Sequence, residues 1–245
     1  MAKRPFLTAM WRYLLMLNFE IDPDVLWPFL PAGTELDTWN GRHYVSLVAF
    51  LFQNTRVWGV SIPFHRHFEE INLRFYVRRR TNEGERRGVV FVREIVPRWA
   101  IATVARLAYN ENYIAMPTRH HLEKGKNGLA VAYEWRFQGN WQQVAAQAQG
   151  EPKPLVAGSE AEFIAEHYWG YSRGRNGRTI EYQVTHPAWR IWSVTDFTFT
   201  CDVAALYGPQ FLPAFSTPPL SVFLAEGSAV AVYPGRPLPG QKENT

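Results

Sequence analysis

Cysteine and long apolar runs are scarce in this chain of 245 residues. The one cysteine, Cys201, excludes an intramolecular disulfide and any metal site built from cysteines alone, and its acidic neighbour Asp202 disfavours a reactive thiolate. No run reaches the roughly 18 apolar residues that a membrane helix needs. The apolar stretch at residues 1–19 contains Arg12 and lacks a small-residue cleavage site, so we interpret it as mature structure. We expect a cytoplasmic protein that does not enter membranes.

Lysine is also rare, because the 26 basic residues are 21 arginines and only 5 lysines, at positions 3, 124, 126, 153 and 242. Against 22 acidic residues they give a net charge of +4. So small an excess does not indicate a polyanionic partner, and without a nucleic-acid-binding motif we expect none. The chain lacks the glycine-rich loops that bind phosphates or dinucleotides and the Gly-x-Ser-x-Gly turn of serine hydrolases, so we expect no cofactor.

Residues that favour β-strands dominate what is present. Runs rich in β-branched and aromatic residues occur at residues 44–52, 68–78, 89–95, 129–137, 179–184, 193–200 and 229–233. Three segments are typical of short helices, at residues 22–30, 99–108 and 159–168. The pattern predicts a mainly β (α+β) protein built as a closed barrel or as two packed sheets. The only linker candidate, residues 150–154, is too short to separate two domains, so we expect a single domain over residues 1–245.

The run at residues 68–78 alternates between apolar and polar side chains. Successive side chains of a strand point to opposite faces. One face therefore carries the apolar row Ile71, Leu73, Phe75 and Val77, and the other carries the polar row Glu70, Asn72, Arg74 and Tyr76. The polar row either faces water on an outer strand or lines a polar cavity. In a cavity its guanidinium could bind a carboxylate through two parallel hydrogen bonds.

Arginines cluster after this run. Residues 78–80 and 86–87 are all arginine and flank a turn, which is typical of a solvated hairpin tip. Arg93 and Arg106 differ, because each is embedded among apolar neighbours and would need a partner if buried, for which Glu70 is a candidate.

Two histidines raise the alternative of a metal site. Gly59, five further residues and then His65 and His67 match the opening of a cupin-type motif, since two histidines two apart on a strand can face one ion. The next carboxylates, Glu69 and Glu70, follow too soon, and no later element completes the ligand set. We interpret this stretch as a loop and predict no metal site.

Several motifs, in this order, resemble the YqjF-like family of uncharacterised conserved proteins. They are LPAGTELD at residues 30–37, GRHYVSLV at 41–48, EINLRFYV at 70–77, GVVF at 88–91, AR at 105–106, HPAW at 186–189 and GSAVAVYP at 227–234. The resemblance covers nearly the whole chain. That family is similar to the acetoacetate decarboxylase-like superfamily, which implies a closed β-barrel with flanking strands and a few short helices.

The resemblance also implies a pocket whose chemistry differs from that of the decarboxylases after which the superfamily is named. The decarboxylases form a Schiff base through a desolvated lysine that follows a glycine-x-proline segment. Here the corresponding AMPTR segment at residues 115–119 carries Thr118 and Arg119, and arginine stays protonated and cannot take the role. Glu70 matches a carboxylate that lines the superfamily's active site. We therefore expect no Schiff-base decarboxylation.

The leading hypothesis is a barrel site for a small molecule that bears a carboxylate or a carbonyl. Its candidate catalytic residues are Glu70 as acid/base with Arg74 and Arg106, and its candidate ligand-binding residues are Asn72, Tyr76, Arg93 and Arg119. Two alternatives remain open: a binding module without catalysis, and a structural role in which arginines form ion pairs and tryptophans fill the core. A homo-oligomer is compatible with either.

Overall fold

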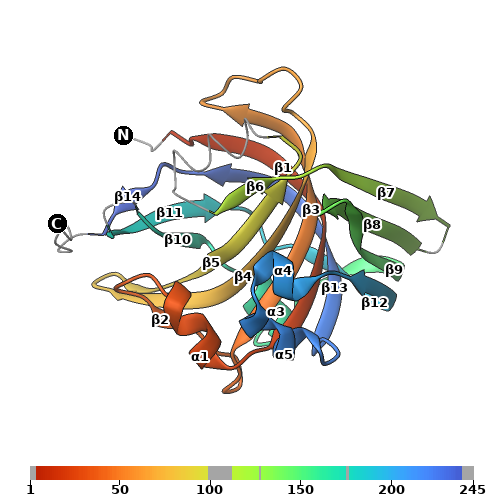
Figure 1. The fold of residues 1–245 in the computed structure, drawn as a ribbon. Coiled ribbons are helices and arrows are strands. Elements are labelled where there is room, and N and C mark those ends of the chain that lie inside the picture. Colours follow the sequence, from red (N-terminus) through yellow and green to blue (C-terminus); the bar gives the residue numbers. More distant parts are fainter. Residues whose placement is uncertain (1–3, 99–111, 127, 175–176, 239–245) are drawn as a thin grey trace.

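The chain folds mostly into β-strands, with a few short helices. The computed structural model describes residues 4–98, 112–126, 128–174 and 177–238 (Figure 1). Within these residues no helix is both long and apolar enough to cross a membrane.

The strands are β1 (Leu7–Glu20), β2 (Glu35–Leu36), β3 (Tyr44–Val57), β4 (Phe68–Thr81), β5 (Gly84–Val96), β6 (Tyr113–Ala115), β7 (Thr118–Gly125), β8 (Gly128–Phe137), β9 (Asn140–Pro154), β10 (Trp169–Arg173), β11 (Thr179–Thr185), β12 (Arg190–Thr200), β13 (Ser221–Val232) and β14 (Arg236–Pro237). The α-helices are α1 (Pro23–Leu26), α3 (Glu160–Ala165), α4 (Val203–Tyr207) and α5 (Leu212–Phe215). Two 3-10 turns, η1 (Trp27–Phe29) and η2 (Pro209–Phe211), extend α1 and precede α5.

The strands hydrogen-bond in the order β14-β11-β10-β5-β4-β3-β1-β13-β12-β9-β8-β7. A further antiparallel pairing joins β11 to β13, with Val184 opposite Val232. The pairings therefore return to their starting point through β13, β1, β3, β4, β5, β10 and β11, which we call the strand ring. Most of its pairings are antiparallel, whereas β10 runs parallel to β5.

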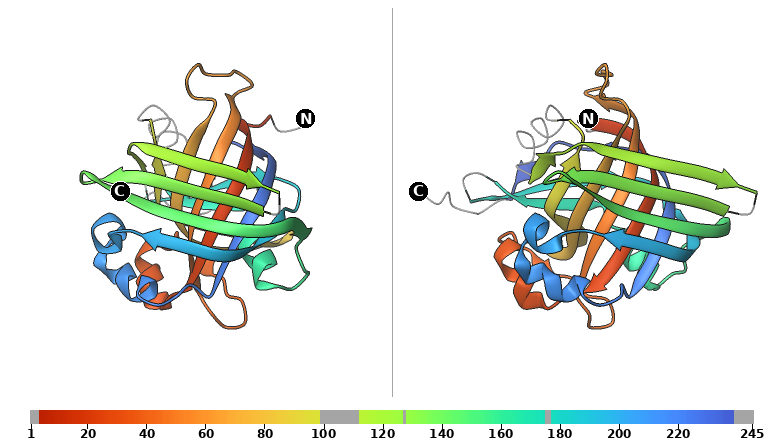
Figure 2. Two further views of the ribbon diagram at one scale, coloured as in Figure 1. Left: turned by 90° about the vertical axis from the view of Figure 1, so that its right-hand side faces the viewer. Right: turned by 45° about the vertical axis from the view of Figure 1, so that its right-hand side comes forward.

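A second layer covers part of the outside of the strand ring. Figure 2 shows β7, β8, β9 and β12 lying across β1, β3, β4 and β13. A large apolar cluster lies between the layers and includes Leu15 of β1, Leu73 and Phe75 of β4, and Tyr133 and Trp135 of β8. A separate cluster, with Met16, Phe50 and Phe163, lies on the other face of the same strands. Both faces of β1, β3 and β4 are therefore buried, which explains their near-continuous apolar sequences.

The predicted elements match this architecture closely. Each predicted strand run lies in or overlaps a strand, and the helices predicted at residues 22–30 and 159–168 are present, capped by the side chains of Asp22 and Ser159. The helix predicted at residues 99–108 lies outside the described residues. Seven strands and the helices α4 and α5 were not predicted, and the missed strands include β1 and β9, which are among the longest.

Closure of the strand ring between β5 and β10 depends on glycine. Gly88 lies opposite Trp169 in the parallel pairing. A Cβ atom added to Gly88 would lie 2.6 Å from the carbonyl oxygen of Trp169, closer than real Cβ contacts allow. Because the obstructing atom is backbone, a side chain at this position would push the two strands apart.

We expect Gly88→Ala to lower the free energy of unfolding by about 1–3 kcal/mol, the usual cost of overpacking. Gly125→Ala is the matched control, since a Cβ there meets only the oxygen of Gly128 at 3.8 Å, and its effect should stay within about 0.5 kcal/mol. Urea unfolding measures both variants. Equal losses of unfolding free energy at the two positions would contradict the inference that the close approach of β5 and β10 excludes a side chain at Gly88.

Candidate functional site

A pocket of about 190 Å³ is lined by side chains from all seven strands of the strand ring. Most of the lining is apolar, including Phe6, Leu7, Trp11, Leu14, Phe50, Phe52, Val57, Ile62, Phe68, Val89, Phe91, Trp169, Val184 and Val232. Its polar members include six from β4, β5, β6 and the segment before β10: Glu70, Asn72, Arg74, Glu94, Tyr113 and His167. An apolar cavity with a few convergent polar groups is the usual form of a small-molecule site.

The polar row of β4 is buried rather than solvated. Glu70, Asn72, Arg74 and Tyr76 are respectively 3%, 2%, 8% and 1% exposed. The apolar row of the same strand packs into the large apolar cluster between the two layers. From the sequence, the polar row could face either water or a cavity. In the structure, three of its four residues line the pocket. Tyr76 lies beside the lining, with Arg74 5.7 Å from the centre of its ring.

Glu70 is a buried carboxyl held by two donors. The amide of Asn72 donates to Oε1 at 3.0 Å, and the hydroxyl of Tyr113 donates to Oε2 at 3.3 Å. Burial raises the pKa of Glu70 to about 7, although these hydrogen bonds and the charge of Arg74 oppose the shift. A carboxyl with a pKa near neutrality can both give and take a proton, which is what general acid–base catalysis requires.

The other end of the polar row meets helix α3. Nη2 of Arg74 donates to the carbonyl oxygen of Ile164 at 3.1 Å, which fixes the guanidinium against the helix. The ring of His167 lies 4.8 Å from that of Tyr76, and Phe163 meets the same imidazole edge-on at 5.5 Å. Arg74 and His167 therefore share one aromatic wall.

A chain of buried hydrogen bonds anchors Tyr76 from behind. Its hydroxyl and that of Ser46 are 2.7 Å apart, Ser46 donates to Oδ1 of Asn18 at 2.7 Å, and the amide of Asn18 donates to the hydroxyl of Ser221 at 3.0 Å. Ser221 in turn donates to Glu160 of α3. The chain crosses β4, β3, β1 and β13 and ends on α3, so it fixes the wall on which Arg74 and His167 lie.

Several pocket atoms are buried without a hydrogen-bond partner. Within the described residues these are Nε1 of Trp11, Oγ1 of Thr55, Oδ1 of Asn72, Nε of Arg74 and both ring nitrogens of His167. Each such group costs free energy unless water or a ligand satisfies it. The cavity therefore contains several polar groups whose hydrogen-bonding capacity is not used by the protein itself within the described residues. His167 was missed by the sequence analysis, because it follows α3 in an irregular segment that no periodic pattern covers.

The remaining predicted site residues lie elsewhere. Arg93 lies opposite Leu73, on the face of β4 and β5 that carries the apolar row, and its charge acts on Tyr207 of α4. Arg119 is exposed on β7, where Nε lies 2.6 Å from Oε2 of Glu134. Arg106 lies outside the described residues. The structure thus brings Glu70, Asn72 and Arg74 together and leaves Arg93 and Arg119 away from the pocket.

The two candidate metal-binding histidines are in the loop between β3 and β4. His65 lines the pocket with its Nδ1 2.8 Å from the carbonyl oxygen of Pro63, whereas His67 is exposed. In the described part of the chain no group of three or more His, Cys, Asp or Glu side chains is arranged to hold a metal ion.

The lysines that the structure describes do not line the pocket. Lys124 and Lys126 are exposed at the β7–β8 turn, and Lys153 is exposed on β9. No residue lining the pocket within the described ranges is a lysine.

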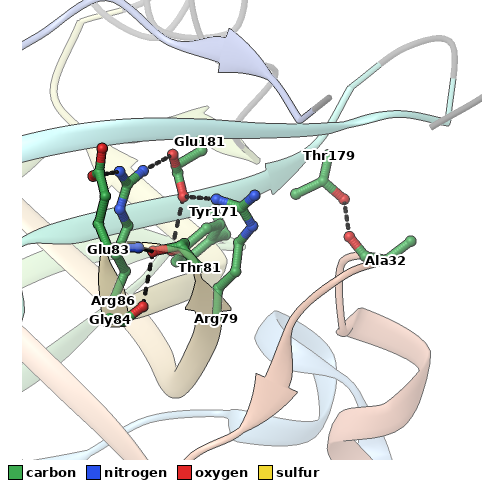
Figure 3. A network of polar contacts seen from close by, with 9 residues as sticks. All are labelled: Ala32, Arg79, Thr81, Glu83, Gly84, Arg86, Tyr171, Thr179 and Glu181. Atoms are coloured by element: carbon green, nitrogen blue, oxygen red, sulfur yellow. Dashed lines mark hydrogen bonds and ion pairs between the residues drawn. The ribbon is translucent and has the colours of Figure 1, made fainter. Parts of the chain in front are cut away.

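The arginines of the β4–β5 hairpin are mostly paired with acids, whereas Arg80 is 72% exposed, so the expectation of a solvated tip is only partly right. Nη1 of Arg79 lies 2.9 Å from one oxygen of Glu181, and Nη1 of Arg86 lies 2.6 Å from the other (Figure 3). Nε of Arg87 is 2.7 Å from Oδ2 of Asp37. The guanidinium of Arg86 also lies 4.2 Å from the centre of the Trp169 ring, which lines the pocket. These arginines therefore fasten β11 and one wall of the pocket to the hairpin.

The comparisons with known proteins agree with this architecture. The family model DUF2071, described as an uncharacterised conserved protein, matches residues 8–229. The chain belongs to the DUF2071 family. It is similar to the uncharacterised protein YqjF of Bacillus subtilis (strain 168), with 28% identity over 184 residues, covering 73% of this chain and 72% of that protein. The resemblance on which the sequence analysis relied is confirmed.

Solved structures with the same fold include two named enzymes. The enduracididine biosynthesis enzyme MppR complexed with pyruvate superposes with a TM-score of 0.68 at 14% identity, covering 100% of this DUF2071 chain and 93% of that chain. Acetoacetate decarboxylase from Legionella pneumophila gives a TM-score of 0.64 at 13% identity, covering 96% and 87%. At such low identities the likeness shows a shared fold.

The raised pKa of Glu70 makes the stability of this DUF2071 protein depend on pH. Between its ordinary pKa of 4.5 and about 7, the folded state keeps a proton that the unfolded state has lost. Raising the pH across this interval therefore favours unfolding. We expect the unfolding free energy of the wild type, relative to Glu70→Gln, to fall by an amount on the order of 3 kcal/mol over this range.

Urea titrations at a series of pH values measure the difference. Glu123→Gln is the control, because that side chain is 76% exposed, and its difference from the wild type should stay flat. A flat difference for Glu70→Gln as well would mean that Glu70 titrates as an ordinary carboxyl.

Proposed function

We propose that the strand ring is a closed β-barrel in a single domain and that its pocket binds a small molecule bearing a carboxylate or a carbonyl. The observation that carries the proposal is the set of buried pocket atoms without partners, above all the N–H donors Nε of Arg74 and Nε1 of Trp11. A carboxylate oxygen placed at Arg74 would accept a charge-assisted hydrogen bond, which is among the stronger polar contacts in proteins.

The electrostatic balance of the pocket supports an anionic ligand. Burial favours the neutral form of Glu70 at and below neutral pH, since its pKa is raised to about 7. The guanidinium of Arg74 stays charged. With Glu70 protonated, the guanidinium of Arg74 is the positive group in a poorly solvated lining that also contains the carboxyl of Glu94, and a ligand carboxylate would bind at Arg74.

In the proposed site Glu70 exchanges the proton, Arg74 holds the carboxylate or stabilises an oxyanion, and Asn72 orients the ligand through Glu70. Lyase-like or hydrolase-like acid–base chemistry without a covalent intermediate fits these groups. MppR is named in complex with pyruvate, a small keto acid, on the same fold. The alternative, a non-catalytic binding module, shares every contact and differs only in that the bound compound is not consumed.

We expect Arg74→Met to weaken the binding of pyruvate, acetoacetate and 3-phenylpropionate by roughly 10- to 100-fold, because a hydrogen bond to a charged group contributes about 1.5–3 kcal/mol. Methionine is similar in length and suits a site that already contains Met16. Titration calorimetry measures the affinities. Arg119→Met removes an exposed arginine as a control and should leave the affinities unchanged. Equal losses of affinity in both variants would argue against binding of the carboxylate at Arg74.

Borohydride reduction in the presence of acetoacetate tests the expected absence of Schiff-base chemistry. A Schiff base needs a neutral amine beside the bound keto group, and Lys124, Lys126 and Lys153 are all exposed. We expect the intact mass of the protein to stay unchanged after reduction. A stable adduct, mapped to any lysine by peptide mass spectrometry, would overturn this expectation.

A further inference from the structure

His167 is a buried imidazole for which the proposed function has no use so far. It lies between α3 and β10, is 7% exposed and lines the pocket. Tyr76 packs against its face and Phe163 against its edge, so the ring has little freedom to turn. Its position is therefore as well defined as that of Arg74 on the same wall.

Both ring nitrogens of His167 lack a hydrogen-bond partner within the described residues. Burial lowers the pKa of His167 well below its usual value, and the positive charges of Arg87 and Arg74 and the neighbouring His186 add to this effect, whereas the backbone of Ile164, whose geometry is not that of a normal hydrogen bond, opposes it. The ring is therefore neutral at physiological pH, with one nitrogen as a donor and the other as an acceptor.

The pocket thus contains unsatisfied acceptors as well as donors. Arg74 and Trp11 offer N–H groups, which a carboxylate can satisfy. His167 and Asn72 each offer a lone pair that no carboxylate or keto group can satisfy, because those groups only accept hydrogen bonds. A ligand that matches the whole set must bring a hydrogen-bond donor of its own, and a hydroxyl group on a carboxylic acid is the simplest one.

We propose that His167 accepts a hydrogen bond from a hydroxyl group of the bound carboxylate, so that the pocket selects hydroxy acids over the corresponding keto and unsubstituted acids. This inference rests on the proposed function, because it presumes that Arg74 holds a carboxylate. His167 acts as a specificity-determining residue, and no covalent step is involved.

We expect the part of the ligand beyond its carboxylate and hydroxyl groups to be apolar. Beyond Glu70 the polar row gives way to an aromatic cluster, in which the rings of Phe52 and Phe68 stack at 4.5 Å. Trp11 meets Phe50 edge-on at 5.2 Å and Phe52 at 5.8 Å. All four side chains line the pocket, so a hydroxy acid with an aromatic or branched apolar body suits it better than a small one.

Three compounds that differ at one carbon test the inference: 3-phenyllactate with a hydroxyl, phenylpyruvate with a keto group and 3-phenylpropionate with neither. We expect the wild-type protein to bind 3-phenyllactate at least about tenfold more tightly than the other two, since a site built around a hydroxyl rejects analogues that leave its polar groups unpaired. Titration calorimetry gives the three dissociation constants.

Two substitutions then assign the preference to His167. His167→Phe keeps an aromatic ring in the same cage, and it should abolish the preference while leaving the affinity for 3-phenylpropionate within about threefold of the wild type. His167→Gln keeps an acceptor and should restore part of the preference. His121→Phe, at a side chain that is 74% exposed, is the matched control and should behave as the wild type.

The outcomes separate this inference from the proposed function. Equal binding of the three acids by the wild type, or a hydroxyl preference that survives in His167→Phe, would overturn the role of His167 and leave the carboxylate site standing. If none of the acids binds, the proposed function fails and the inference fails with it. If His167→Phe does not fold, the preference of the wild type for 3-phenyllactate and the binding of the three acids by His167→Gln still test the role of His167.

Discussion

The properties of the pocket depend on the burial of the polar face of β4. Glu70, Asn72 and Arg74 are taken out of water because the strand ring surrounds them, and desolvation then raises the pKa of the carboxyl to about 7. The closure rests on a narrow contact: β5 and β10 approach so closely at Gly88 that no side chain fits there. The properties of the pocket therefore depend on a backbone contact that carries no chemistry itself.

The surrounding elements hold this arrangement in place through polar contacts. The hydrogen-bond chain from Tyr76 to Glu160 connects four strands and α3 behind the pocket. On the other side, Glu181 joins Arg79 and Arg86, and Arg86 covers Trp169. Such fully bonded networks specify one packing of the strands, whereas a purely apolar wall would permit several.

Local periodicity was enough to predict seven of the fourteen described strands and the two faces of β4, because alternation depends only on neighbouring residues. It failed at β1, whose polar and apolar residues do not alternate cleanly: Tyr13 has a positive φ of 55° beside a register shift, so Trp11 and Leu14 both reach the pocket. It also could not pair Arg79 with Glu181, since 102 residues separate them. His167 was invisible for the same reason, as its surroundings exist only after α3 packs against β4.

Arginine in place of lysine changes what a pocket of this fold can do. A buried lysine loses its proton readily and becomes a nucleophile, whereas a buried arginine keeps its charge and can only bind and orient. In the proposed site the pKa values of Glu70, Tyr113 and His167 are shifted, and all three shifts favour the neutral form. Among its polar groups the pocket therefore offers the fixed positive charge of Arg74, the carboxyl of Glu70 that can donate and the imidazole of His167 that can accept. Those properties suit recognition of a monoanion with a hydroxyl group and proton transfer to or from it, and they disfavour covalent attachment to the protein.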